Sequence, residues 1–139
     1  MTQNNRASPE AAILIIEDDD VTATRLQDDL FGAGYVVRRA GSAAEALTSL
    51  KSTPADLILM KLMLPDTDGL ILCSTLKATF PAPIILLSTR ASEVDRALAM
   101  QSGALDCMAT TVDVAELLEY VRAAVQAPGV GQKSGRARY

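Results

Sequence analysis

Charged and hydroxylated residues stand directly after several short apolar runs, and their types are the ones that support chemistry. Glu17 and Asp18 follow the first run, Lys61 closes the third, Ser88 closes the fourth, and Thr110 follows the fifth. Adjacent carboxylates repel each other unless a cation lies close to both of them. We therefore expect the Lys61 ammonium to reach the two acids as their counter-charge; the alternative is that Lys61 extends into solvent and the acids stay hydrated.

Composition excludes several classes of site. The 139 residues include no histidine, which removes histidine-based triads and histidine metal ligands. Cys73 and Cys107 are far apart and fit no zinc or redox spacing, so we expect two buried, reduced thiols. A formal net charge of −4 argues against direct binding of nucleic acid by the folded part. Three acids, and no glycine-rich loop, follow the first run, which disfavours a phosphate cradle.

The chain is expected to form one domain with a short extension at each end. Residues 1–10 are polar and predict a disordered lead, 11–126 predict the domain, and 127–139 predict a flexible basic tail or linker. The apolar runs are far shorter than the ~20 residues of a membrane span. Since the first residues also have no hydrophobic signal core, we expect a cytoplasmic protein without membrane contact.

Strand and helix signals alternate strictly along the chain. The expected strands are Ala12 to Ile16, Tyr35 to Val37, Asp56 to Lys61, Pro83 to Ser88 and Asp106 to Ala109. The helices between and after them are indicated by Val21, Leu26 and Leu30, by a capping box from Ser42 to Glu45, by Leu70 to Phe80, by Ser92 to Gly103, and by Asp113 to Gln126. This alternation predicts an α/β fold with a doubly wound, five-stranded parallel sheet. Functional crevices in such sheets lie beyond the carboxyl ends of the strands.

Four segments, in order, resemble the receiver domain of two-component response regulators. They are ILIIEDD, DLILMKLMLPDTDG, PIILLSTR and SGALD, the last followed by a capped helix. The resemblance covers about Ile13 to Val125 and implies the (βα)5 flavodoxin-like receiver fold with strand order 2-1-3-4-5. It also implies a bacterial, cytoplasmic signalling protein.

The resemblance implies a phosphorylation site in which four positions have changed. Receiver domains normally transfer a phosphoryl group to an aspartate after the third strand, assisted by Mg²⁺ and a lysine. Glu17 and Asp18 match the metal-binding acids, and Ser88 matches the switch hydroxyl. The acceptor position is Lys61, the lysine position is Thr110, the following proline is Thr111, and the switch aromatic is Cys107.

These changes predict a pseudo-receiver that is not an enzyme. A lysine amine does not form the acyl phosphate, and its charge repels Mg²⁺, so we expect no cofactor and weak or absent Mg²⁺ binding. Asp66 and Asp68 are expected to shape a turn, with Asp68 capping the third helix, rather than to replace the acceptor. Two alternatives stay open: a working receiver inactivated by an engineered change to Lys61, and a flavodoxin-like binder of a small ligand.

The remaining function expected is protein interaction or dimerisation that is independent of phosphorylation. The resemblance points to the face formed by the fourth helix, fifth strand and fifth helix, with an OmpR/PhoB-like pattern. Its charged residues are Glu93, Arg96, Asp106, Glu119 and Arg122, among which Arg96, Asp106 and Arg122 would pair across a two-fold axis. An ordinary solvated surface is the alternative. An output domain, attached or separate, is the further partner expected, with a role in transcription regulation.

Overall fold

The computed structural model describes residues 11–126, which form one parallel sheet and five helices. The strands are β2 (Ala12–Ile16), β3 (Val36–Ala40), β4 (Leu57–Lys61), β5 (Ile84–Ser88) and β6 (Asp106–Ala109). The helices are α1 (Asp20–Gly32), α2 (Ala43–Ser52), α3 (Gly69–Thr79), α4 (Glu93–Gln101) and α5 (Val114–Val125). The expectations for residues 1–10 and 127–139 fall outside the described residues.

The sheet has the order β3-β2-β4-β5-β6, and all of its neighbouring strands are parallel. Counted along the chain, this is the expected order 2-1-3-4-5. The register aligns Ile16 with Met60, and Lys61 with Leu87. The carboxyl ends of β2, β4 and β5 therefore meet at one edge, where Glu17, Lys61 and Ser88 stand.

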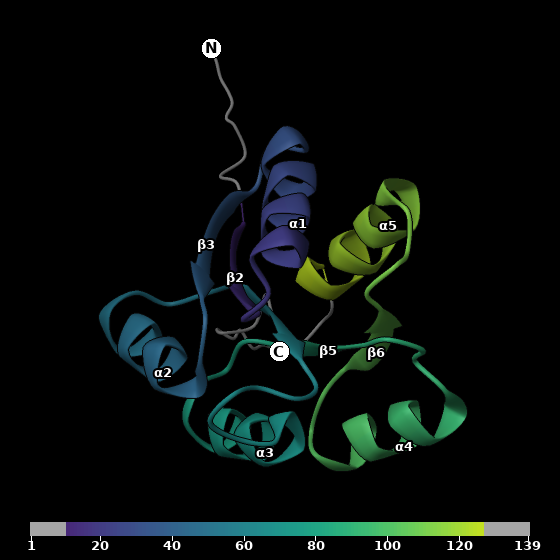
Figure 1. Ribbon diagram of the computed structural model, residues 1–139. Coiled ribbons are helices and arrows are strands. Elements are labelled where there is room, and N and C mark those ends of the chain that lie inside the picture. The colour runs from purple at the N-terminus through teal and green to yellow at the C-terminus, as the bar shows by residue number, and fades with distance from the viewer. Residues whose placement is uncertain (1–10, 127–139) are drawn as a thin grey trace, which may run out of the picture.

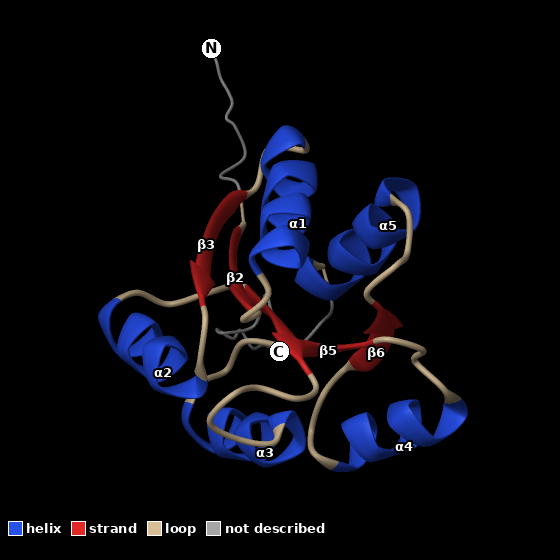
Figure 2. Cartoon of the chain, in the orientation of Figure 1, coloured by secondary structure: helices blue, strands red, loops and turns tan. Residues whose placement is uncertain are grey.

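Helices cover both faces of the sheet, as Figures 1 and 2 show: α1 and α5 lie on one face, and α2, α3 and α4 on the other. The central strands are buried on both faces, which explains why their sequences are continuous apolar runs. Alternate residues separate into two cores. Ile13, Ile15 and Leu59 pack toward α1 and α5, whereas Leu14 and Met60 belong to the opposite core.

Two expected details of the elements are wrong. The strand expected at Tyr35 to Val37 runs from Val36 to Ala40, because an edge strand accommodates Arg38 and Arg39 when their guanidinium groups find acceptors. Val21, expected on the inner face of the first helix, is 79% exposed. The buried face of α1 consists of Ala23, Leu26 and Leu30, which keep the helical spacing.

Side chains at the helix starts tie the loops of this edge together. Asp68 caps α3 as expected, and accepts a hydrogen bond from the Leu70 amide at 2.7 Å. Asp66 lies in the bend between β4 and α3, and its carboxylate has a further role: it accepts from the amides of Ala43 and Ala44 at the start of α2. The loop after β4 is therefore held by the helix after β3.

Candidate functional site

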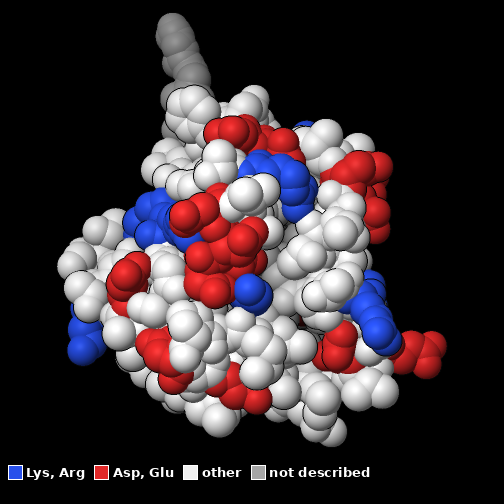
Figure 3. Space-filling model, viewed as in Figure 1, with Lys and Arg blue, Asp and Glu red and all other residues white. Residues whose placement is uncertain are grey.

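The Lys61 ammonium lies between the two acids that follow β2. Its Nζ is 2.9 Å from Asp18 Oδ1 and 3.3 Å from Glu17 Oε2. The Lys61 side chain is 33% exposed, and the Glu17 side chain only 1% exposed. The expected contact of Lys61 with both acids is confirmed, and the alternative in which Lys61 extends away into solvent is wrong. Figure 3 shows acidic side chains gathered near the centre of this face, with basic side chains beside them.

The buried Glu17 carboxylate depends on a small set of partners. Its Oε2 also accepts from the Asp19 amide at 3.0 Å, which shapes the start of α1. The Arg39 guanidinium donates to the Glu17 carbonyl at 3.0 Å and pairs with Asp20 at 2.8 Å. Burying a charge is costly unless it is paired and hydrogen-bonded, and Lys61 is the only cation within ion-pair distance of this carboxylate among residues 11–126.

The backbone after Lys61 is fixed by a close approach that requires glycine. The Gly69 amide donates to the Leu62 carbonyl at 2.7 Å. A Cβ at Gly69 would lie 2.5 Å from the Leu62 carbonyl oxygen and 2.6 Å from that of Lys61, which is closer than real contacts allow. The start of α3 therefore packs directly on the backbone at the end of β4.

The ion pairs change the acid–base properties of both partners. The hydrogen bond from Lys61 holds the pKa of Asp18 below its ordinary value of 3.8. The same hydrogen bond to Asp18 raises the pKa of Lys61 above 10.5, against the opposing effect of burial. At neutral pH, Lys61 is therefore a permanent cation and not a nucleophilic amine.

This arrangement does not fit Mg²⁺. The ion takes oxygen ligands at about 2.0–2.1 Å, with Asp or Glu carboxylates among them. Here the two carboxylates already bind an ammonium group, and a metal ion beside it would meet a like charge at close range. No group of three acids, cysteines or histidines within residues 11–126 is arranged to hold a metal ion.

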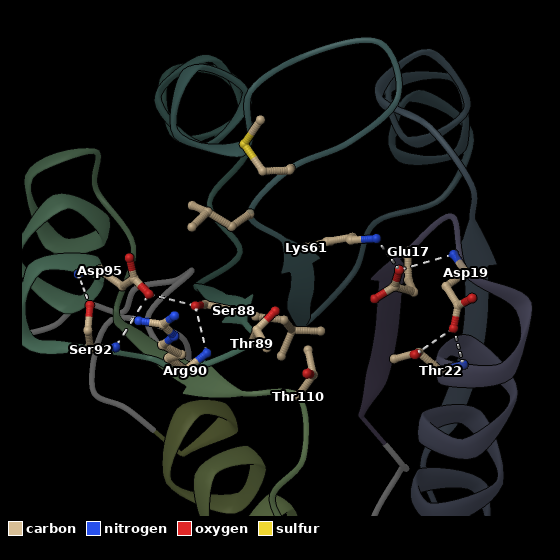
Figure 4. A pocket seen from close by; sticks show the side chains of 13 residues that line it. Glu17, Asp19, Thr22, Lys61, Ser88, Thr89, Arg90, Ser92, Asp95 and Thr110 are labelled. Atoms are coloured by element: carbon tan, nitrogen blue, oxygen red, sulfur yellow. Dashed lines mark hydrogen bonds and ion pairs between the residues drawn. The ribbon is translucent and has the colours of Figure 1, made fainter.

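Ser88 lies on the opposite side of the same cavity, and its hydroxyl points away from Lys61 (Figure 4). Its Oγ donates to Asp95 Oδ2 at 2.6 Å and accepts from the Ala91 amide at 3.1 Å. The hydroxyl therefore bonds to the local backbone, and the Asp95 carboxylate is a partner that the sequence did not indicate. The cavity between Lys61 and Ser88 has a volume of about 560 Å³.

Thr110 and Cys107 complete the changed positions. Thr110 lines the cavity, and its carbonyl accepts a hydrogen bond from Arg25 of α1, a contact that the sequence did not predict. Cys107 is fully buried, and burial raises the pKa of its thiol. Cys73 is also buried with a raised pKa, and both cysteines are free, as expected. The described residues contain no cis peptide bond.

The charged residues expected on the face of α4, β6 and α5 have contacts within their own chain. Arg96 pairs within its own chain with Asp106 at 2.8 Å and donates to the Tyr120 hydroxyl at 3.2 Å. Arg122 lies away from this pair, in a groove that it lines with Asp28 and other residues of α1. Glu93 and Glu119 are exposed as expected. Pairing of Arg96, Asp106 and Arg122 across a two-fold axis stays a prediction.

Comparison with known proteins identifies the family. The family model for the response regulator receiver domain matches residues 13–122 of this chain. The chain belongs to this family. Solved receiver structures agree: a response regulator from Chloroflexus aurantiacus has a TM-score of 0.79 at 32% identity, covering 84% of this chain and 98% of that one. The receiver domain of RstA from Klebsiella pneumoniae gives 0.78 at 29% identity, with coverage of 83% and 98%.

Curated relatives of this receiver domain are longer transcription regulators. The DNA-binding response regulator MtrA of Mycolicibacterium smegmatis is 35% identical over 111 residues, which are 80% of this chain and 49% of MtrA. AfsQ1 of Streptomyces coelicolor, a transcriptional regulatory protein, is 35% identical over 115 residues, which are 83% of this chain and 51% of AfsQ1. The chain thus spans about half the length of these relatives. No helix within residues 11–126 is long and apolar enough to cross a membrane.

Replacing Lys61 by methionine should destabilise the domain by roughly 1–3 kcal/mol, because the buried Glu17 carboxylate loses its ionic partner. Denaturant unfolding at pH 7 measures the change. Lys51→Met, at an exposed position in α2, is the matched control and should cost less than about 0.5 kcal/mol. Adding Glu17→Gln to Lys61→Met should recover part of the lost stability. A Lys61→Met variant as stable as the parent protein would contradict the role assigned to Lys61.

The same ion pair predicts a pH dependence. Since the folded pKa of Asp18 is lowered, its contribution to stability is fully present above its ordinary value of 3.8 and is lost as the pH falls through the lower folded value. Unfolding free energies measured from pH 5 to pH 2 should therefore fall more steeply for the parent than for Lys61→Met. Parallel curves for the two proteins would show that Lys61 does not set this titration.

Proposed function

We propose that this receiver domain signals by protein interaction that is independent of phosphorylation. The observation that carries the proposal is the position of Lys61, whose ammonium binds Glu17 and Asp18 where the family holds its metal ion. The site thus has a permanent cation and no acyl-forming carboxylate at the acceptor position. The domain acts as a non-enzymatic module.

The further changes support a natural pseudo-receiver over an engineered block. Thr110, Thr111 and Cys107 also depart from the family pattern. Cys107 packs in the core, and Thr110 is held by Arg25 through its carbonyl. A single engineered substitution would leave these positions unchanged.

Calorimetric titration with Mg²⁺, with and without beryllofluoride, tests the proposal. The parent should show no binding at millimolar Mg²⁺, because the acids are occupied by Lys61. Lys61→Asp should gain Mg²⁺ binding, since three carboxylates then meet at the strand ends. Tight Mg²⁺ binding by the parent would overturn the proposal.

The surface that we assign to interaction is the outer side of α4 with the adjoining start of β6. Val94 and Leu98 are one helical turn apart and are 66% and 41% exposed, and Leu105 before β6 is 44% exposed. Arg96 and Asp106 pair with each other within the chain, whereas Val94, Leu98 and Leu105 leave apolar area exposed on α4 and just before β6. We propose that it binds a second copy of the domain by apolar burial rather than by ion pairs.

Val94→Glu should weaken this self-association by about tenfold or more, because a charge would be buried at the centre of the interface. Sedimentation velocity over a concentration series measures the dissociation constant. Val21→Glu is the matched control, since Val21 is 79% exposed on α1, and should leave association unchanged. Equal effects of the two variants, or a parent that stays monomeric, would contradict the assigned surface.

The output of the domain is proposed by analogy with its longer relatives. MtrA is described as DNA-binding and AfsQ1 as a transcriptional regulatory protein, and the matched region is about half of each. We propose that self-association of this domain controls an output domain, attached or separate, that regulates transcription.

A further inference from the structure

The cavity at the strand ends separates two hydrogen-bonded clusters. On one side Lys61 points toward Glu17, and on the other Ser88 points toward Asp95 (Figure 4). Within residues 11–126, no hydrogen bond or ion pair joins Lys61 to Ser88. The two strand ends are neighbours in the sheet, but their functional side chains turn in opposite directions.

The Ser88 hydroxyl is buried and has used its full bonding capacity. It donates to Asp95 Oδ2 at 2.6 Å, and accepts from the amides of Arg90 at 3.3 Å and Ala91 at 3.1 Å. A hydroxyl has one donor and two acceptor sites, so all three are taken. These bonds join the end of β5, the following loop and the first turn of α4.

The loop that Ser88 holds contains a strained residue. Ala91 has a φ of 52°, in the left-handed region that residues with a Cβ adopt at a cost in free energy. The Ala91 amide is one of the two that bond to Ser88, so the hydroxyl stabilises this conformation directly. Loss of that bond would favour relaxation of the loop to another conformation.

The Asp95 carboxylate extends the network into α4. Its Oδ2 also accepts from the Ser92 amide at 3.3 Å, and the Ser92 hydroxyl accepts from the Asp95 amide at 3.1 Å, which completes a capping box. The Ser88 hydrogen bond holds the pKa of Asp95 below its usual range, with a smaller contribution from Arg90, so this acceptor is ionised at neutral pH.

Helix α4 has little else to fix its first turn. Ala99, in its second half, is the one fully buried residue of the helix. Arg96 adds a contact to Asp106, but the residues before it, Glu93 and Val94, are exposed. The position of Val94 on the outer surface therefore depends on the network that starts at Ser88.

We propose that Ser88 and Asp95 form a latch that sets the conformation of residues 89–95 independently of the Lys61 cluster. Asp95 is thus a positioning residue for the outer surface of α4. The consequence for self-association rests on the proposed function; the latch itself does not.

Amide hydrogen exchange in the monomeric, dilute protein tests the latch. Ser88→Ala should accelerate exchange at Arg90 and Ala91 by about tenfold or more, because these amides lose their acceptor. Ser88→Thr keeps the hydroxyl and should exchange like the parent. Lys61→Met should leave these two amides within about twofold of the parent and accelerate exchange at Asp19, whose amide binds Glu17. Core amides of β4 serve as the reference for global unfolding.

A double-mutant cycle makes the test independent of how strongly any single variant is destabilised. Changes in the unfolding free energy for Ser88→Ala and Asp95→Ala should be non-additive, whereas each should be additive with Lys61→Met. Faster amide exchange at Arg90 and Ala91 in Lys61→Met would overturn the latch. So would additive changes in unfolding free energy for Ser88→Ala and Asp95→Ala.

Self-association is measured separately, so that the two proposals fail separately. If the latch holds and the α4 surface binds a second copy, Ser88→Ala weakens the association and Lys61→Met does not. A monomeric parent with the expected exchange pattern contradicts the docking surface and leaves the latch supported. If the parent is a dimer and Lys61→Met accelerates amide exchange in the loop, the latch is contradicted and the docking surface stays supported.

Discussion

The charge balance at the end of β2 is the constraint on which the rest of this site depends. Glu17 is buried at a strand end and Asp18 follows it, so the fold requires a positive charge at this point. The family resemblance implies that a divalent ion supplies this positive charge in other receiver domains. Here a side chain from the neighbouring strand supplies it, and the surrounding groups are arranged around that fixed cation: Arg39 on the backbone of Glu17, and Gly69 beneath the end of β4.

Because the cation is part of a side chain, it keeps the acids after β2 and the hydroxyl of Ser88 in two separate groups. An exchangeable ion would couple these groups. Lys61 binds its acids on the far side of the cavity from Ser88. Ser88 in turn is saturated by the loop and by Asp95. The edge of the sheet that holds one connected site in the family is divided here into two local structures, each complete by itself.

Much of this architecture was predictable because buried parallel strands leave a plain signal. Continuous apolar runs ending in polar residues located the strands, the family resemblance supplied their order, and that order placed Lys61 beside Glu17. The partners of long side chains were not predictable. Arg25 reaches Thr110 from 85 positions away, and Arg96 pairs with Asp106 and contacts Tyr120 of its own chain. Such contacts depend on helix rotation and on rotamers, which spacing does not specify; the exposed Val21 shows the same limit for helix faces.

The pairing of Arg96 with Asp106 within the chain bears on how the outer side of α4 would associate with a partner. Those two charges are paired, and Val94, Leu98 and Leu105 expose apolar side chains near them. A surface of this composition associates by removing apolar area from water, and such association weakens on cooling and is strengthened by salts like sulfate. Temperature is then a physical variable to which association through this surface would respond.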